Sequence, residues 1–328
     1  MPDERENMKI NALRDFIAVA QHGSLRAAAR RLGVSQSALS RSVQGLEHRI
    51  GSALFERQST GIHLTSMGSA FLQRAKAVHN ELDRAYQELQ QMAGRHRGRV
   101  CVSMGSLPHI ALLPYALGQF RQRYPEVQLD LRDQLMPKVL NDLVDGTIDF
   151  YVGPVLEELP PTLVSESWLI AHRVVVGRRG HPLLKAQSLG ELSDAQWASL
   201  SLTDRADDEL TSLFAQHGLP SPQVTVVARS ALSLLSVLTY SDALAVLPVE
   251  WTRTPMFAGL LNEFSVSETL GSPRVHLVQK AGLPLTPAAE YLCDMLRRAA
   301  AHRDMERSDA HLASRHPICT LPAGSSRT

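Results

Sequence analysis

Short helical periods dominate the first seventy residues of the chain. Apolar residues recur at helix spacing over residues 13–20, and Gly23 ends that helix. Two more helices follow, and each begins after a serine that can cap its free N–H groups, Ser24 and Ser35. The turn between them is short and contains Gly33. Two helices joined in this way predict a helix-turn-helix.

The pattern then changes to a small hairpin and one long helix. The segment ALFERQSTGIHLT reads as two short strands around a turn at 59–61, which predicts a wing beside the third helix. The following helix, 67–93, is capped by Thr65 or Ser66 and would extend about 40 Å. Its apolar residues have the 4-3 spacing of a coiled-coil seam: Phe71, Ala75, Val78, Leu82, Ala85, Leu89 and Met92. This seam favours pairing with a second copy, and the alternative is a helix lying on its own domain.

Beyond a predicted hinge at 94–98, strands alternate with helices. The strands read VCVSM, VQLDLR, IDFYVG, HRVVVG, WASLSL, VTVVA, ALAVLP and RVHLVQK. Helices are expected at 109–124, 139–144, 209–217, 232–240 and 288–299. This order predicts an α/β domain with parallel sheets and right-handed crossovers. Residues 301–328 have no clear periodicity, and we expect a disordered tail.

Composition narrows the classes of protein. The chain has 328 residues, 44% apolar and 20% charged, which suits about two globular domains. The first ten residues are charged and no long apolar span occurs, so we expect a cytoplasmic protein without a membrane segment. Cys101, Cys293 and Cys319 lack zinc-site spacing, and neither a metal nor another cofactor is indicated. Hydrolase, P-loop and dinucleotide motifs are absent from the sequence, so we do not expect an enzyme.

Charge is distributed unevenly. Residues 1–98 carry 14 Lys and Arg against 9 Asp and Glu, a net charge of +5, whereas residues 99–328 carry 20 against 24, a net charge of −4. A basic module of this kind attracts a polyanion. Residues near the start of the third helix face away from its apolar stripe and are expected to read base edges: Ser35, Gln36, Ser37, Ser40 and Arg41. Arg30, Arg31 and Arg57 are expected to bind phosphate.

The ungapped stretch Leu13–Gly68 resembles the N-terminal signature of the LysR-type transcriptional regulators. The resemblance implies a winged helix-turn-helix at 8–66, a dimerising linker helix and an effector domain at 99–300 that is similar to periplasmic binding proteins. That domain would have two α/β subdomains, 99–168 with 270–300, and 169–269. The resemblance also implies a homo-oligomer, usually a dimer of dimers, which binds an interrupted inverted repeat of double-stranded DNA, a small-molecule effector and RNA polymerase. Ser37 and Thr60 depart from the family pattern, which often has Pro and Arg there.

Ligands of open α/β sheets lie beyond the carboxyl ends of strands, and Ser106 follows the first strand of this domain. The resemblance adds Met136, and Thr203 with Arg205 on the opposite wall. Arg205 can pair with a carboxylate or sulfonate, although it can equally balance neighbouring aspartates. Ser230 is a further candidate, or only a helix cap. We therefore expect an organic anion as effector.

Two alternatives stay open. The fold could serve as a thiol redox sensor, although residues 169–269, where the family's peroxide sensors hold their cysteine pair, contain no Cys. The chain could also be a ligand-binding module that makes no DNA contact of its own. A salt-dependent DNA affinity separates the second alternative from a regulator.

Overall fold

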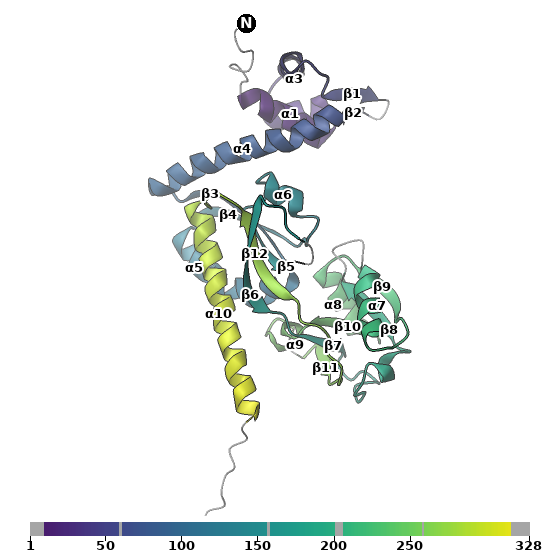
Figure 1. Ribbon diagram of the computed structural model, residues 1–328. Coiled ribbons are helices and arrows are strands. Elements are labelled where there is room, and N and C mark those ends of the chain that lie inside the picture. The colour runs from purple at the N-terminus through teal and green to yellow at the C-terminus, as the bar shows by residue number, and fades with distance from the viewer. Residues whose placement is uncertain (1–9, 59–60, 156–157, 201–205, 258, 316–328) are drawn as a thin grey trace, which may run out of the picture.

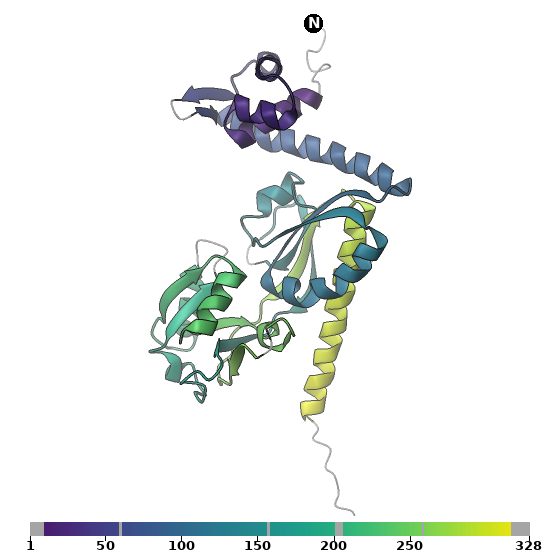
Figure 2. The same cartoon turned by 180° about the vertical axis from the view of Figure 1, so that it is seen from behind.

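The computed structural model describes residues 10–58, 61–155, 158–200, 206–257 and 259–315. Three parts follow one another along the chain: a small helical unit, the long helix α4, and a two-lobed α/β domain (Figure 1). Helix α4 lies between the helical unit and the nearer lobe, and the view from behind shows the same order (Figure 2). Within the described ranges, none of the helices combines the length and apolar content needed to span a membrane.

The N-terminal unit is a winged helix-turn-helix. It consists of α1 (Ile10–His22), α2 (Leu25–Leu32), α3 (Gln36–Ile50), β1 (Phe55–Gln58) and β2 (Gly61–Leu64). The two strands pair antiparallel to form the wing. The ring of Phe16 on α1 is fully buried, with its centroid 5.1 Å from that of Phe55 and 5.3 Å from that of Phe71. One aromatic cluster therefore joins the first helix, the wing and α4.

Helix α4 (Ser66–Met92) is fixed to the wing at its first turn. Thr65 is the N-cap: its Oγ1 accepts from the N–H of Gly68 at 2.9 Å and donates to the carbonyl of Ala53 at 2.8 Å. A Cβ atom added at Gly68 would lie 2.0 Å from the carbonyl oxygen of Leu54, so the close approach of α4 to the wing requires glycine here. The orientation of α4 relative to the DNA-binding unit follows from this junction.

Subdomain I contains a five-stranded sheet in the order β4-β3-β5-β12-β6. Its elements are β3 (Arg97–Met104), the π-helical turn η2 (Pro108–Leu112), α5 (Leu113–Arg123), β4 (Glu126–Arg132), α6 (Leu140–Val144), β5 (Phe150–Pro154), β6 (Leu163–Ile170), β12 (Arg274–Lys280) and α10 (Pro287–Arg315). Strands β3, β4 and β5 are parallel, but β12 runs antiparallel to β5 and β6. The sheet is mixed, so the expectation of a parallel sheet is correct for β3, β4 and β5 and wrong for β12, because the chain leaves along β6 and returns along β12.

Subdomain II is also mixed. Its elements are β7 (Arg173–Arg178), the 3₁₀ turn η3 (Gly190–Leu192), β8 (Gln196–Leu200), α7 (Ala206–Gln216), β9 (Gln223–Ala228), α8 (Ala231–Tyr240), β10 (Ala245–Pro248), α9 (Glu250–Arg253) and β11 (Leu261–Phe264). Strands β8 and β9 are parallel, while β7 pairs antiparallel with both β10 and β11. A bridge between Trp197 and Leu244 joins the two groups of strands. Strands β6 and β11 were not predicted.

Three predicted boundaries differ from the structure. Strand β3 already begins at Arg97, inside the predicted hinge. The crossovers between subdomains lie at 171–172 and 272–273, a few residues beyond the expected limits, and are tied by a hydrogen bond from the N–H of Ala171 to the carbonyl of Pro273 at 2.9 Å. Helix α10 continues to Arg315, so the prediction of disorder is wrong for 301–315. That stretch contains neither Gly nor Pro and is rich in good helix formers. Residues 316–328 lie outside the described residues.

Candidate DNA interface and effector cleft

The recognition helix α3 is held by polar contacts at its first turn. Ser35 is the N-cap, and its Oγ accepts from the N–H of Ala38 at 3.1 Å. The hydroxyl of Ser37, where the family often has proline, lies 3.2 Å from the Oγ of Ser35. Ser37 therefore extends the polar cap, and its side chain is exposed. It lies at the N-terminal end of α3, which is the end that a recognition helix presents to the major groove.

The other contacts of α3 fix its position beside the wing. Leu39, Val43 and Leu46 form its buried face. On the wing side, the carboxylate of Glu47 accepts from the N–H groups of Leu54 at 2.8 Å and Phe55 at 3.0 Å. The helix is thus held on two sides, and its third side is open to a ligand.

The predicted base-reading side chains occupy that open side, with one exception. Gln36 and Arg41 are exposed, whereas Ser40 is half-buried. Ser40 lines a cavity of about 130 Å³ in the crease between α3 and the wing, together with Phe55 and Ile62. The open face therefore offers one amide and one guanidinium, which suit the edges of adenine and guanine.

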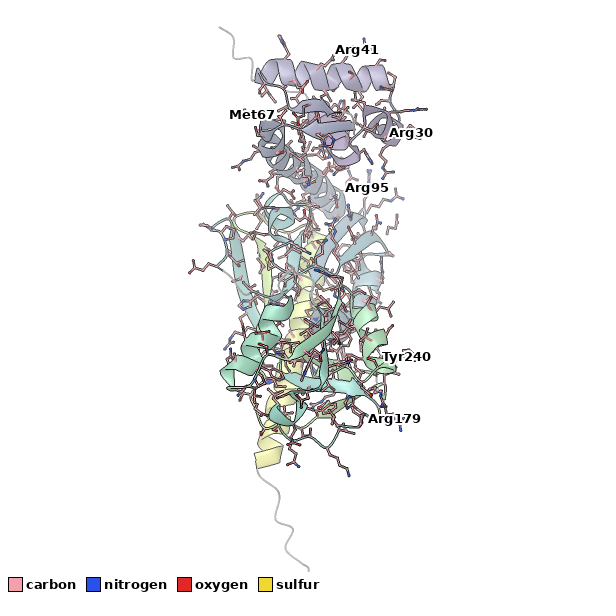
Figure 3. All side chains as sticks on the ribbon, turned by 90° about the vertical axis from the view of Figure 1, so that its right-hand side faces the viewer. Arg30, Arg41, Met67, Arg95, Arg179 and Tyr240 are labelled. Carbon is pink, nitrogen blue, oxygen red and sulfur yellow. The ribbon has the colours of Figure 1, made fainter. Side chains whose placement is uncertain are left out.

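Two more exposed arginines lie on α2. Arg30 and Arg31 lie in the last turn of α2 and are both exposed. Figure 3 shows Arg41 and Arg30 at the end of the molecule farthest from the effector domain. The side chain of Arg57 and the turn containing Thr60 lie outside the described residues. The described side chains form a basic surface suited to a phosphate backbone.

The candidate effector site includes Ser106, which lies two residues after the end of β3 and begins a helical segment. The indole N–H of Trp251 on α9 donates to the Oγ of Ser106 at 3.5 Å, across the two subdomains. Trp251 is fully buried and stacks on Phe257 with ring centroids 5.2 Å apart. Trp251 was not predicted, yet it follows the carboxyl end of β10 just as Ser106 follows that of β3, so the same strand-end rule identifies it.

The remaining predicted effector residues are not all brought to this point. Met136 packs against the apolar cluster around Val139 and Leu143 in subdomain I, which commits its thioether to that core. The hydroxyl of Ser230 caps α8 by accepting from the N–H of Ser233 at 3.1 Å. Thr203 and Arg205 lie outside the described residues. The described geometry thus joins the half-buried Ser106 of subdomain I to a buried indole of subdomain II.

A separate cavity of about 370 Å³ lies beside the crossovers, lined by 172–174, 263–266 and 268–272. Arg173 faces it but is already bound: its guanidinium pairs with Glu209 and donates to the carbonyls of Leu270 at 2.6 Å and Gly271 at 3.2 Å. Arg173 therefore holds the 265–272 loop in place.

Most of the predicted seam of α4 is exposed in the protomer. Val78, Leu82, Leu89 and Met92 are all more than two-fifths exposed, while Ala75 is buried against the DNA-binding unit. Large apolar side chains in a continuous exposed strip mark an interaction surface. The opposite face of α4 contacts subdomain I of the same chain, so the alternative of a helix lying on its own domain is correct for that face, and pairing through the seam stays a prediction.

The two described cysteines are poor candidates for a thiol switch. Burial raises the pKa of Cys101 and of Cys293 to about 12. The reactive species of a redox cysteine is the thiolate, which such a pKa suppresses at neutral pH. In the described ranges, His, Cys, Asp and Glu side chains form no group of three or more suited to a metal ion.

Fold and sites together define a class: a winged helix-turn-helix protein with a two-lobed ligand-binding domain. Residues 10–69 match the family described as bacterial regulatory helix-turn-helix protein, lysR family, and residues 93–301 match the LysR substrate binding domain. The chain belongs to the LysR family, and it is a DNA-binding transcriptional regulator with an effector-binding domain.

Individual relatives agree with this assignment. The SDS degradation transcriptional activation protein of a Pseudomonas species is 29% identical over 289 residues, covering 86% of this chain and 93% of the relative. The regulator GalR of Pseudomonas putida is 27% identical over 288 residues, covering 87% and 72%. Among solved structures, the LysR family regulator CbnR has a TM-score of 0.64 at 23% identity, covering 89% of this chain and 99% of that one. A full-length OxyR variant from Pseudomonas aeruginosa has a TM-score of 0.67 at 21% identity, covering 91% and 98%. These two show the shared fold.

Proposed function

We propose that this regulator binds the two half-sites of an interrupted inverted repeat through paired copies of α3, with the seam of α4 holding the copies together. The observation that carries the proposal is the open face of α3, where Gln36 and Arg41 are exposed, together with the exposed Arg30 and Arg31 of α2. A dimer matches the symmetry of such a repeat, because each copy presents one recognition helix. A dimer of dimers and a contact with RNA polymerase belong to the same proposal, as does action in the cytoplasm, where the DNA is.

Selection from a random DNA pool tests this function. The full-length protein should enrich an inverted repeat, and its affinity for that repeat should fall with salt at a log–log slope near −0.9 for each phosphate neutralised. A ligand-binding module without DNA contact would enrich no sequence and show no such slope. Binding of random and enriched DNA with equal affinity would refute sequence-specific recognition.

For the effector we propose an organic anion, and the half-buried ring of Phe257, which stacks on the buried Trp251, favours one with an aromatic part. Ser106 would donate to its polar end, and Arg205 would supply the positive charge. Native mass spectrometry of the purified protein can detect a retained small molecule. If the retained molecule is an anion, Ser106→Ala and Arg205→Ala should each abolish its retention while affinity for the enriched DNA stays close to wild type. Retention in both variants would place the site elsewhere.

A further inference from the structure

One face of α4 is polar, and the structure uses that face to hold the effector domain. The side chains concerned recur at helix spacing: Lys76, Asn80, Arg84, Gln87 and Gln91. Asn80 precedes Leu82 by two residues and Gln87 precedes Leu89 by two, which is about 200° around the helix axis. The polar face is therefore opposite the exposed apolar seam, and both can be occupied at once.

The first contacts are made to the loop between α6 and β5. The ammonium of Lys76 lies 3.5 Å from the carboxylate of Asp145. The amide of Asn80 donates to the backbone carbonyl of Asp145 at 2.9 Å. The same carboxylate accepts from the N–H of Thr147 at 2.9 Å, so the loop presents an ordered acceptor surface to α4.

Arg84 makes the central contact. Its guanidinium donates to the carbonyls of Gly146 at 3.3 Å and Ile148 at 3.1 Å, and it pairs with the carboxylate of Asp149 at 3.1 Å. Each side chain of that pair is only 11% exposed. Asp149 in turn accepts from the N–H of Cys101 at 2.7 Å, which ties the pair to β3. A buried ion pair needs several donors and acceptors in place at once, so it specifies one arrangement of helix and sheet.

The last contacts span the predicted hinge. The side-chain carbonyl of Gln87 accepts from the N–H of Arg99 at 3.0 Å. Gln91 is 5% exposed, and its amide donates to the carbonyl of Arg97 at 3.3 Å while its carbonyl accepts from the N–H of Ala288 at 2.9 Å. Gln91 thereby links α4, which precedes the hinge, to β3 and to the start of α10, which follow it.

We propose that these five side chains form a polar latch, which fixes the effector domain against α4 and whose release reorients the two DNA-binding units of a dimer. The proposal rests on the proposed function, because the latch acts on the regulator described there. Its physical basis is that α4 is fixed to the wing at Thr65 and Gly68, so an angle set at the latch is carried to α3. A ligand changes such an angle only if it binds the latched and released arrangements with different affinity.

A disulfide tests whether the latch exists in solution. A Cβ atom added at Gly146 lies 3.5 Å from the Cβ of Asn80, which is within the range of a disulfide, although the φ of +75° at Gly146 strains any side chain placed there. The double variant Asn80→Cys, Gly146→Cys, made with Cys319→Ser, should form an intrachain bond on oxidation that dithiothreitol reverses. The single-cysteine variants are the controls. Failure to form the bond in the folded protein would overturn the proposal.

Release is tested with Arg84→Gln combined with Gln91→Ala, which removes the central ion pair and the contact across the hinge, and the matched control is Gln73→Ala, an exposed amide elsewhere on α4. Trypsin should cleave the released variant at Arg95 to Arg99 at least tenfold faster than wild type or control, and the oxidised disulfide variant at least tenfold more slowly. The milder variant Asn80→Ser serves if the double substitution does not fold. Unchanged cleavage in the released variant would overturn the proposal without any reference to DNA.

Enriched operator DNA supplies the second readout. The bend angle measured by circular permutation should differ between the disulfide-bonded and released proteins, although both contain an intact DNA-binding unit. The same bend in both would overturn the switch. If the wild type binds no specific DNA, the proposed function fails, and the disulfide and trypsin results still decide whether the latch controls the hinge.

Discussion

The seam of α4 gives a quantitative prediction. Leu82 is 44% exposed in the protomer. Burying a whole leucine side chain is worth about 1.5–3 kcal/mol, so covering its exposed part in a dimer is worth about 1 kcal/mol for each copy. Replacing Leu82 with aspartate removes about 2 kcal/mol from the dimer and also forces two carboxylates against apolar neighbours. When the desolvation of the two carboxylates is included, we expect the free energy of dimerisation to weaken by about 4 kcal/mol, which is roughly a thousandfold rise in the dimer Kd.

The same exposure makes the prediction specific to assembly. Because Leu82 is 44% exposed and is not among the buried core residues of the protomer, Leu82→Asp should change the unfolding temperature of the isolated protomer only slightly. Gln73→Asp is the matched control, since it adds the same charge at an exposed position away from the seam. Sedimentation over a concentration series gives the mass and Kd, and mobility shift gives the affinity for a two-half-site operator. A Leu82→Asp protein with wild-type Kd and wild-type affinity would refute the seam as the dimer contact.

Three further predictions follow from the sites. Arg41→Ala should weaken binding to the enriched sequence by about 1–3 kcal/mol and binding to random DNA much less, whereas Arg30→Ala should weaken binding to the two DNAs alike. An Arg41→Ala protein that loses the same affinity for both DNAs would refute base reading by Arg41. In a Cys319→Ser background, the two buried thiols, whose pKa is raised to about 12, should react with iodoacetamide at least a hundredfold more slowly at pH 8 than the same protein in urea, because only about one thiol in ten thousand is then a thiolate. The reaction rate should rise about tenfold per pH unit up to pH 10, and a fast reaction at pH 8 would contradict the burial of the thiols. Ser106→Ala and Trp251→Phe should show a coupling energy of about 0.5–1.5 kcal/mol in a double-mutant cycle on thermal unfolding, and strict additivity would argue against the hydrogen bond between them.

Local sequence determined the elements that depend on local physics. The serines and threonine that begin α2, α3 and α4 are N-caps in the structure, as their positions before apolar helical periods predict. The glycines that end α1, α2 and α3 adopt positive φ angles. The 4-3 spacing in α4 identified an apolar strip that the protomer leaves exposed. Each of these signals lies within a few residues of its effect.

Tertiary structure alone decided the features that depend on distant segments. The direction of β12 depends on the path that the chain takes through the whole of subdomain II. The alternation of apolar and polar residues identifies a strand but does not encode its direction in the sheet. The contact between Ser106 and Trp251 joins residues 145 positions apart. The polar latch has the helix spacing of an ordinary solvated face, because Lys, Asn, Arg and Gln look alike in sequence whether water or a backbone carbonyl receives their hydrogen bonds. Sequence determined which faces α4 has, and only the fold determined what lies against each.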